Sequence, residues 1–321
     1  MKKHVMVGLA ALACSMGAAY AQSSVTAFGF IEAQVARVPG TVDDTKVAAD
    51  FGGSRLGFKG TEDLGGGNKA SFYLEHRLNP GDGTVGGGAT FWKGGSWVGL
   101  SNDQLGAVKL GRWWSQAFLK SQYAADPFGM GTMGEGAYGS VGCGPNFSGG
   151  CLGAFWVNNS ISYENSIGGF SFGVQVGETP TGGTDRPTNV GLSYGAGPLY
   201  IGAGYEKSND GSSDEDWASF AANYDFGPIK LYAGYGTGNT ATSVSRKNIL
   251  VGFSAPVGPG AVILSYDVQD QGGTRVEQLL SAGYKYNFSA RTNVFAVVAN
   301  DSKAPAGTDK TGYAIGMFHS F

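Results

Sequence analysis

The chain has 321 residues, of which only 15% are charged, and its formal net charge at pH 7 is −3. No basic stripe indicates a nucleic-acid partner, and after residue 21 no window approaches the roughly 18 continuous apolar residues of a transmembrane helix. Glycine is unusually frequent at 56 residues, and aromatic residues reach 12%, so the composition is unlike that of an average soluble domain.

Residues 1–21 are predicted to be a cleaved signal peptide. Lys2 and Lys3 form a positive start, an apolar run follows, and Ala19-Tyr20-Ala21 fits a small-residue cleavage site. A first transmembrane helix is the alternative, but the apolar run is too short and no stop-transfer pattern follows it. Cleavage changes the net charge to −5, because it removes two lysines and no acid.

Export also bears on the cysteines. Once Cys14 leaves with the signal peptide, Cys143 and Cys151 remain. In an oxidising compartment their spacing permits one small local disulfide, with two unpaired thiols as the alternative.

An alternation of period two recurs throughout the mature chain, residues 22–321. In 199–205, Leu199, Ile201, Ala203 and Tyr205 alternate with small or polar residues, and the same pattern occurs in 170–177, 229–235 and 262–268. Such segments place apolar side chains on one face of a strand. In a soluble sandwich the opposite face meets bulk water and is usually charged, whereas here it is mostly Gly, Ser, Ala, Gln and Tyr. We therefore expect a lipid-facing wall around a wet interior.

Turns alternate between short and long, as the periplasmic turns and outer loops of a membrane barrel do. Strands counted between them, from residues 25–38 to 311–321, number sixteen. An even number lets the sheet close without an edge, as lipid requires. The predicted fold is all-β, a 16-stranded antiparallel transmembrane barrel.

One stretch interrupts this rhythm, at about residues 115–155. It is rich in glycine, contains both remaining cysteines, and has only two acids, Asp126 and Glu135. A connection of this length in a compact domain is usually functional or disordered. We interpret it as a constriction loop folded into the lumen.

Charges on the neighbouring strands are expected to face the lumen, because a charge on the lipid face costs about 2–4 kcal/mol at the bilayer midplane. Arg55 and Lys59 share one face of their strand, and Glu75 and Arg77 share one face of the next. A field across the pore and a purely supporting pairing of these charges are both open. Alternation places Arg112 on the same face as the apolar residues Val108 and Leu110, so it would need a bulge or the strand end to turn inward.

Five tryptophans lie between residues 92 and 156, on both sides of the proposed loop. One interpretation is an aromatic girdle at the membrane interface. The other is that Trp113 or Trp156 lines the narrowest point and offers a stacking surface to solutes.

Several motifs resemble the Gram-negative porin family. These are the mature start Gln22–Gly29, the run Arg55–Gly67, Val108–Arg112, Asn158–Tyr163 and a terminal Phe321 after alternating apolar residues. The resemblance covers essentially the mature chain. It implies a homotrimer in the outer membrane, in contact with lipid and lipopolysaccharide, with a water-filled channel for small hydrophilic solutes and ions.

By position, the resemblance makes Arg55 and Arg112 wall arginines of the pore, opposite Asp126 and Glu135 on the loop. It places trimer contacts near residues 25–38, 79–88 and 311–321. Where relatives often carry further basic residues, this chain has Gly94-Gly95 beside Lys93. This departure leaves ion selectivity open.

We expect no enzyme, cofactor or metal site. After processing, only His76 and His319 remain as histidines, both on predicted outward faces, and a hydrolase would need one near a nucleophile. The sequence predicts an outer-membrane diffusion channel. The alternatives are a solute-selective channel with an aromatic-lined site and a surface receptor or adhesin barrel.

Overall fold

The computed structural model describes residues 24–42, 45–49, 53–86, 90–129, 156–208, 211 and 214–321. Within these residues the chain forms one antiparallel sheet of seventeen strands. The strands are β1 (Ser24–Arg37), β2 (Lys46–Ala49), β3 (Arg55–Gly65), β4 (Asn68–Arg77), β5 (Ser96–Asn102), β6 (Gly106–Trp114), β7 (Trp156–Ile167), β8 (Phe170–Val176), β9 (Thr188–Ala196), β10 (Leu199–Lys207), β11 (Asp216–Asp225), β12 (Lys230–Asn239), β13 (Ser245–Val257), β14 (Gly260–Gln271), β15 (Thr274–Asn287), β16 (Thr292–Asp301) and β17 (Thr311–Ser320).

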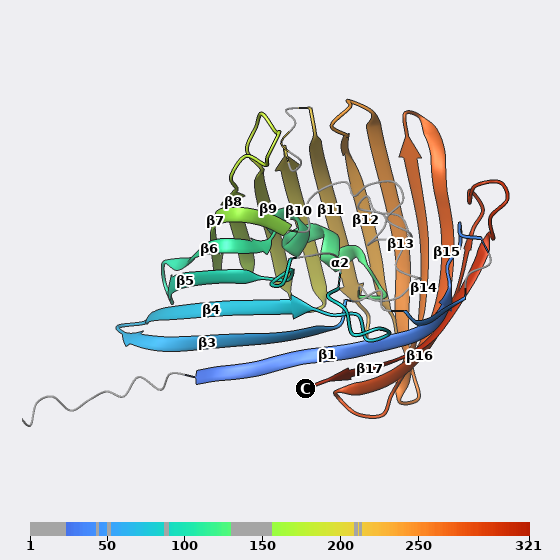
Figure 1. Cartoon of the computed structure of the whole chain (residues 1–321), viewed down its shortest axis with the longest axis horizontal. Coiled ribbons are helices and arrows are strands. Elements are labelled where there is room, and N and C mark those ends of the chain that lie inside the picture. The colour runs from blue at the N-terminus through green and yellow to red at the C-terminus, as the bar shows by residue number, and fades with distance from the viewer. Residues whose placement is uncertain are drawn as a thin grey trace, which may run out of the picture.

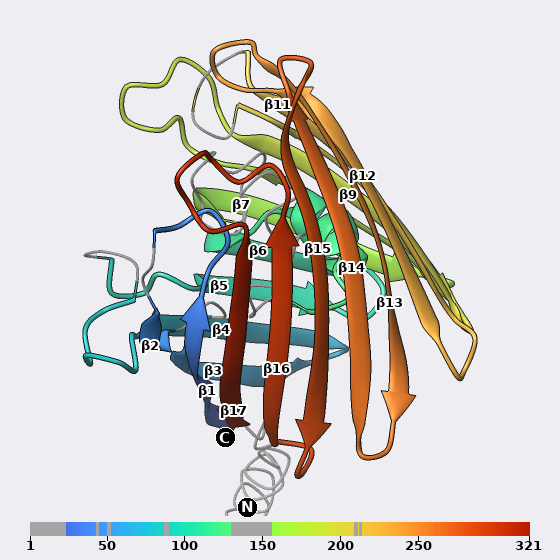
Figure 2. The same cartoon turned by 90° about the vertical axis from the view of Figure 1, so that its right-hand side faces the viewer.

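The sheet closes on itself. Each strand from β3 onward pairs with the next, β17 pairs with β1 from Arg37↔Tyr313 to Phe30↔Ser320, and β1 pairs in turn with β3. Short β2 adds only to the far end of β1, at Gln34 and Ala36, so the wall itself has sixteen strands. The predicted 16-stranded antiparallel barrel is therefore confirmed, and both ends of the wall meet beside the C-terminus (Figure 2).

The two-residue alternation sorts side chains between the two faces of this wall. On β12, Leu231 and Tyr235 are each 44% exposed and point outward, while Gly234 between them lies against Ala125 inside. On β17, Tyr313, Ile315 and Met317 form the same kind of outward apolar row. Large apolar side chains thus cover the outside, as a wall in contact with hydrocarbon requires.

After β6 the chain turns into the barrel. Residues 116–125 form a short helical segment that includes η1 (Phe118–Gln122) and α2 (Tyr123–Ala125), and this segment lies inside the ring of strands (Figure 1). None of the helices in the described ranges is long and apolar enough to cross a membrane.

Glycines on the inner face of the wall make room for this segment. A Cβ at Gly191 of β9 would lie 2.1 Å from the carbonyl oxygen of Gln116, and one at Gly202 of β10 would lie 1.8 Å from that of Lys120. Further along, Phe128 joins a buried apolar cluster that includes Phe295. The segment therefore follows the inner wall from β9 toward β16 in direct contact with it.

Candidate functional site in the lumen

A buried carboxylate holds two arginines on the inner face of β3 and β4. Arg55 and Arg77 are directly paired across these strands. Glu75 is only 1% exposed; its Oε1 lies 2.8 Å from Nε of Arg77, and its Oε2 lies 3.6 Å from Nη1 of Arg55. Both arginines also donate to the carbonyl of Gly53, at 3.2 Å from Arg55 and 2.9 Å from Arg77. Charge-assisted contacts of this kind fix the planar guanidinium groups.

The glycine pair Gly94-Gly95 packs directly on this arrangement. A Cβ at Gly94 would lie 2.2 Å from Oε1 of Glu75, and one at Gly95 would lie 2.7 Å from the rings of Trp113 and Tyr73. A larger residue does not fit at either position while Glu75 and the rings stay in place. The absence of basic residues here therefore has a steric reason.

Arg112 reaches the same region through an irregular end of β6. The pairing of β6 with β7 shifts between Gly111 and Trp113, and Gly111 has φ +135°, a backbone conformation that favours glycine. The Nε of Arg112 donates to the carbonyls of Lys93 (2.9 Å) and Gly94 (3.1 Å). Its Nη1 donates to Oδ1 of Asn158. These contacts place the Arg112 guanidinium near that of Arg77, and both lie over the ring of Trp156.

Trp156 lies at the start of β7. The Cζ atoms of Arg112 and Arg77 lie 5.1 and 5.6 Å from the indole centroid, within cation–π range. Trp156 also stacks on Trp114 at a centroid distance of 3.6 Å. Trp114 in turn stacks on Phe118 of η1 at a centroid distance of 5.0 Å. A row of rings thus connects the arginines to the inward segment.

Lys93 completes what we call the basic wall cluster: Arg55, Arg77, Arg112 and Lys93 with Glu75 among them. Burial lowers the pKa of the Lys93 ammonium, and the positive charges of Arg112 and Arg77 lower that pKa further. Such a shift is the expected result of placing several cations in one partly desolvated place.

A second group of aromatic residues lies further toward the short turns. Trp113 contacts Tyr73 and Trp97 at centroid distances of 5.2 and 5.5 Å, and Nζ of Lys109 lies 4.9 Å from the Trp113 ring. Lys109 also forms an ion pair with Glu164 of β7. Trp113 is therefore a neighbour of this lysine, while Trp156 belongs to the basic wall cluster.

Lys59 is also separate from the cluster. It lies on β3, four positions nearer the short turn than Arg55, with its Nζ 5.2 Å from the ring centroid of Phe28. It shares the inner face of β3 with Arg55, so both cations border the same lumen.

Asp126 has a different environment from the basic wall cluster. It follows α2, is 5% exposed, and its Oδ1 accepts the backbone N–H of Phe128 at 2.8 Å. Glu135, Cys143 and Cys151 lie outside the described residues.

Polar contacts hold the inward segment on the inner face of β9, β10 and β11. Asn189 of β9 accepts the N–H of Gln116 at 2.8 Å, Tyr200 of β10 donates to the carbonyl of Lys120 at 2.9 Å, and Asn223 of β11 donates to that of Ala124 at 3.0 Å. Three consecutive strands thus fix the backbone of the segment.

Sequence reasoning did not find the roles of Lys109, Trp114 and Glu164. Alternation puts Lys109 on the face opposite Val108 and Leu110, so its inward direction could have been read from the pattern. Its pairing with Glu164 depends on the register of β6 on β7, which the pattern does not contain.

Comparisons with known proteins agree with this architecture. A sequence model of the family described as Gram-negative porin matches residues 8–304. Outer membrane porin protein 32 of Delftia acidovorans is 33% identical, over the full length of both chains. The solved anion-selective porin from Comamonas acidovorans superposes with a TM-score of 0.77 at 27% identity, covering 94% of this chain and 100% of the other. OmpT of Vibrio cholerae, solved in a trimer form, has a TM-score of 0.67 at 14% identity, covering 93% and 99%.

The family match spans most of the chain, and the sheet closes into the barrel that the family's motifs imply. The chain therefore belongs to the Gram-negative porin family, the outer-membrane β-barrel channels through which small hydrophilic solutes and ions diffuse passively.

Proposed function

We propose that this porin is an anion-preferring diffusion channel. The observation that carries the proposal is the basic wall cluster, in which Arg55 and Arg77 contact one buried carboxylate, Glu75, and the cations of Arg112 and Lys93 lie near Arg77. Rings of charged side chains at a narrow point are a general selectivity device of channels.

The physical reason is an excess of positive charge on one stretch of wall. Glu75 is in contact with two guanidinium groups and has almost no exposed surface, so its charge is neutralised locally. Arg112 carries further positive charge and donates to the backbone carbonyls of Lys93 and Gly94. The Lys93 ammonium lies close enough to Arg112 and Arg77 for their charges to lower its pKa. A passing anion is therefore attracted, and the low dielectric of the surrounding wall strengthens that attraction.

The family relationship supports the proposal. A solved structure that superposes on nearly the whole chain is named an anion-selective porin. The sequence alone left selectivity open, and the cluster geometry now favours anions.

We further propose that the loop at about residues 115–155 narrows the lumen. Its part from Ser115 to Gly129 runs along the inner wall, and Trp156 after it contacts the basic wall cluster. Asp126 and Glu135 remain proposed loop acids, Lys59, Trp113 and Trp156 proposed lining residues, and Cys143–Cys151 a proposed disulfide of that loop.

A homotrimer, exported with cleavage after residue 21 and surrounded by lipid and lipopolysaccharide, is the proposed assembly. OmpT, which shares the fold, has been solved in a trimer form. The outward apolar rows of β1 and β17, with Ile31, Val35 and Ile315 exposed, offer a surface near the proposed contact strands. Native electrophoresis of unheated samples tests this, with a band at three chain masses expected and a monomer band contradictory.

The experiment for the main proposal is the reversal potential of the purified porin in a planar bilayer with a potassium chloride gradient. We expect the sign set by chloride permeation. A sign set by potassium would overturn the anion preference, and a protein that inserts without conducting would favour the receptor or adhesin alternative.

A further inference from the structure

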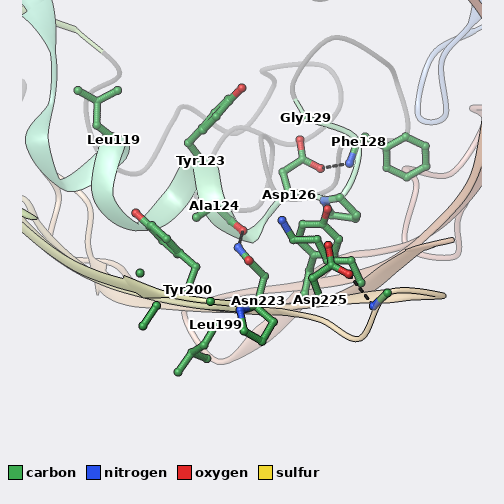
Figure 3. A pocket seen from close by; sticks show the side chains of 18 of the residues that line it. Leu119, Tyr123, Ala124, Asp126, Phe128, Gly129, Leu199, Tyr200, Asn223 and Asp225 are labelled. Carbon is green, nitrogen blue, oxygen red and sulfur yellow. Dashed lines mark hydrogen bonds between the residues drawn. The ribbon is translucent and has the colours of Figure 1, made fainter. Parts of the chain in front are cut away.

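A hollow lies beside the inward segment, and none of its lining residues belongs to the basic wall cluster. It has a volume of about 1020 Å³ and lies between residues 119–129 and the short turns that join β9 to β10 and β11 to β12. Tyr123 and Asp126 of the segment and Tyr200, Asn223 and Asp225 of the strands are among its lining residues, labelled in Figure 3. Lys230, Tyr232 and Lys285 complete its polar and aromatic lining.

The hollow contains opposite charges that are not paired with each other. Asp225 and Lys230 are directly opposed across β11 and β12, yet no ion pair joins them in the described part of the chain. Asp225 uses Oδ1 to accept the N–H of Gly227 at 2.8 Å, which leaves Oδ2 to the hollow. Nζ of Lys230 lies 5.2 Å from the Tyr232 ring centroid. Both charges are thus available to a solute.

Aromatic surface lies next to these charges. Tyr123 is 50% exposed, so much of its ring surface is accessible. Tyr200 is fixed in direction, because its hydroxyl donates to the carbonyl of Lys120 at 2.9 Å. Tyr232 is half-buried beside Lys230. Fixed aromatic faces bind flat apolar groups by offset or edge-to-face contact.

The charge balance determines the class of solute. Lys230 and Lys285 attract a carboxylate, while Asp225 attracts an ammonium and repels a second negative charge. Asp126 contributes less direct contact, since it is 5% exposed and accepts the Phe128 N–H. A simple anion meets attraction and repulsion together, whereas a zwitterion satisfies both signs.

We propose that this hollow is a binding station for zwitterionic aromatic solutes, the aromatic amino acids being the simplest. The carboxylate lies at Lys230 or Lys285, the ammonium at Asp225, and the ring against Tyr232 and Tyr123. The inference rests on the proposed channel function, since the solute reaches the hollow through the lumen. It adds a preference that the basic wall cluster cannot supply, because that cluster offers no anionic partner with exposed surface.

The test is current noise of the inserted porin at pH 7 with four probes: L-phenylalanine, 3-phenylpropionate, 2-phenylethylamine and L-alanine. These keep the zwitterion with its ring, remove the ammonium, remove the carboxylate, and remove the ring, respectively. We expect binding noise to be strongest with phenylalanine. Equal noise from 3-phenylpropionate would overturn the role of Asp225, and equal noise from alanine would overturn the role of the rings.

Variants localise the effect. Lys230→Gln, Asp225→Asn and Tyr232→Leu should each weaken phenylalanine binding by about threefold to fivefold, the range for one partly solvated contact. Lys303→Gln, in the exposed turn between β16 and β17, is the matched control and should change nothing. Unchanged conductance in each variant shows that the barrel has folded. Unaltered phenylalanine binding in all three variants would overturn the proposal.

The two proposals fail separately. The reversal potential reports the basic wall cluster, and phenylalanine noise reports the hollow. A cation-selective wild type that still binds phenylalanine would reject only the anion preference, and an anion-selective wild type without phenylalanine noise would reject only the binding station.

Discussion

At the scale of single residues, Glu75 organises the basic wall cluster. It is the buried acid that contacts both Arg55 and Arg77, and it accepts the Tyr73 hydroxyl at 2.6 Å. Removing one member of a buried charge group leaves the others uncompensated, which is more harmful than never having built the group.

We therefore predict that Glu75→Gln lowers the free energy of unfolding by about 1–3 kcal/mol, because Arg55 and Arg77 lose the carboxylate that they contact. Urea unfolding in detergent, followed by tryptophan fluorescence, measures it. Glu62→Gln, an exposed position on the neighbouring strand β3, is the control and should change stability little. Equal stability of the two variants would show that Glu75 does not hold the arginines.

Lys93 makes the selectivity depend on pH. Because its pKa lies below that of an ordinary lysine, its charge is lost at a lower pH than the charge of an exposed lysine. We predict that the anion preference falls as pH rises toward 10.5, the ordinary pKa of lysine, before exposed lysines lose their charge. Reversal potentials at a series of pH values measure this. In Lys93→Gln this pH-dependent part should be absent, and its persistence would assign the titration to another group.

At the scale of elements, the glycines of the inner wall position the inward segment. A Cβ added at Gly202 would meet the backbone carbonyl oxygen of Lys120, which cannot rotate away as a side chain can. Gly195, on the neighbouring strand β9, would meet only a ring atom of Tyr200, at 3.8 Å. The same substitution at these two positions therefore separates contact with the segment from the general effect of losing a glycine.

We predict that Gly202→Ala destabilises the barrel by about 1–3 kcal/mol through overpacking and alters single-channel conductance by moving the segment. Gly195→Ala should stay within about 0.5 kcal/mol of wild type. Thermal unfolding in detergent and single-channel recording give the two measurements. If both variants behave alike, the close approach of the segment to β10 is not important for its position.

The strands themselves could be predicted from the sequence to a large extent, but the residue-by-residue register of their pairing could not. Alternation alone gives the faces of 199–205, because period two is a local property. The path of Arg112 into the lumen depends on Gly111 and on an irregular register with β7. The grouping of Arg77 with Trp156 depends on where distant strands meet. The sequence predicted that Arg112 needed a bulge but contained no signal for its partners.

At the scale of the whole molecule, the two faces of the wall meet different surroundings, hydrocarbon outside and water inside. Val98 is 57% exposed on the outer face of β5, while Thr61 is exposed on the inner face of β3. A lysine costs about 2–4 kcal/mol on the lipid face near the midplane and little in a water-filled lumen.

We predict that Val98→Lys lowers folding yield into lipid vesicles and lowers stability there by about 2 kcal/mol, whereas Thr61→Lys folds like wild type. Electrophoretic mobility of unheated samples reports the folded fraction. The reverse ranking would mean that the faces have been assigned the wrong way round.

The role of the basic wall cluster in ion selectivity is measured by the change in reversal potential when positive charge is removed from the wall. We predict an anion-preferring wild type and a loss of at least about fivefold in the anion-to-cation permeability ratio in Arg77→Gln/Arg112→Gln, since one unit charge at 4 Å is worth about 1 kcal/mol in water. Lys303→Gln should match the wild type. An unchanged ratio in the double variant, or a wild type that prefers cations, would contradict the account.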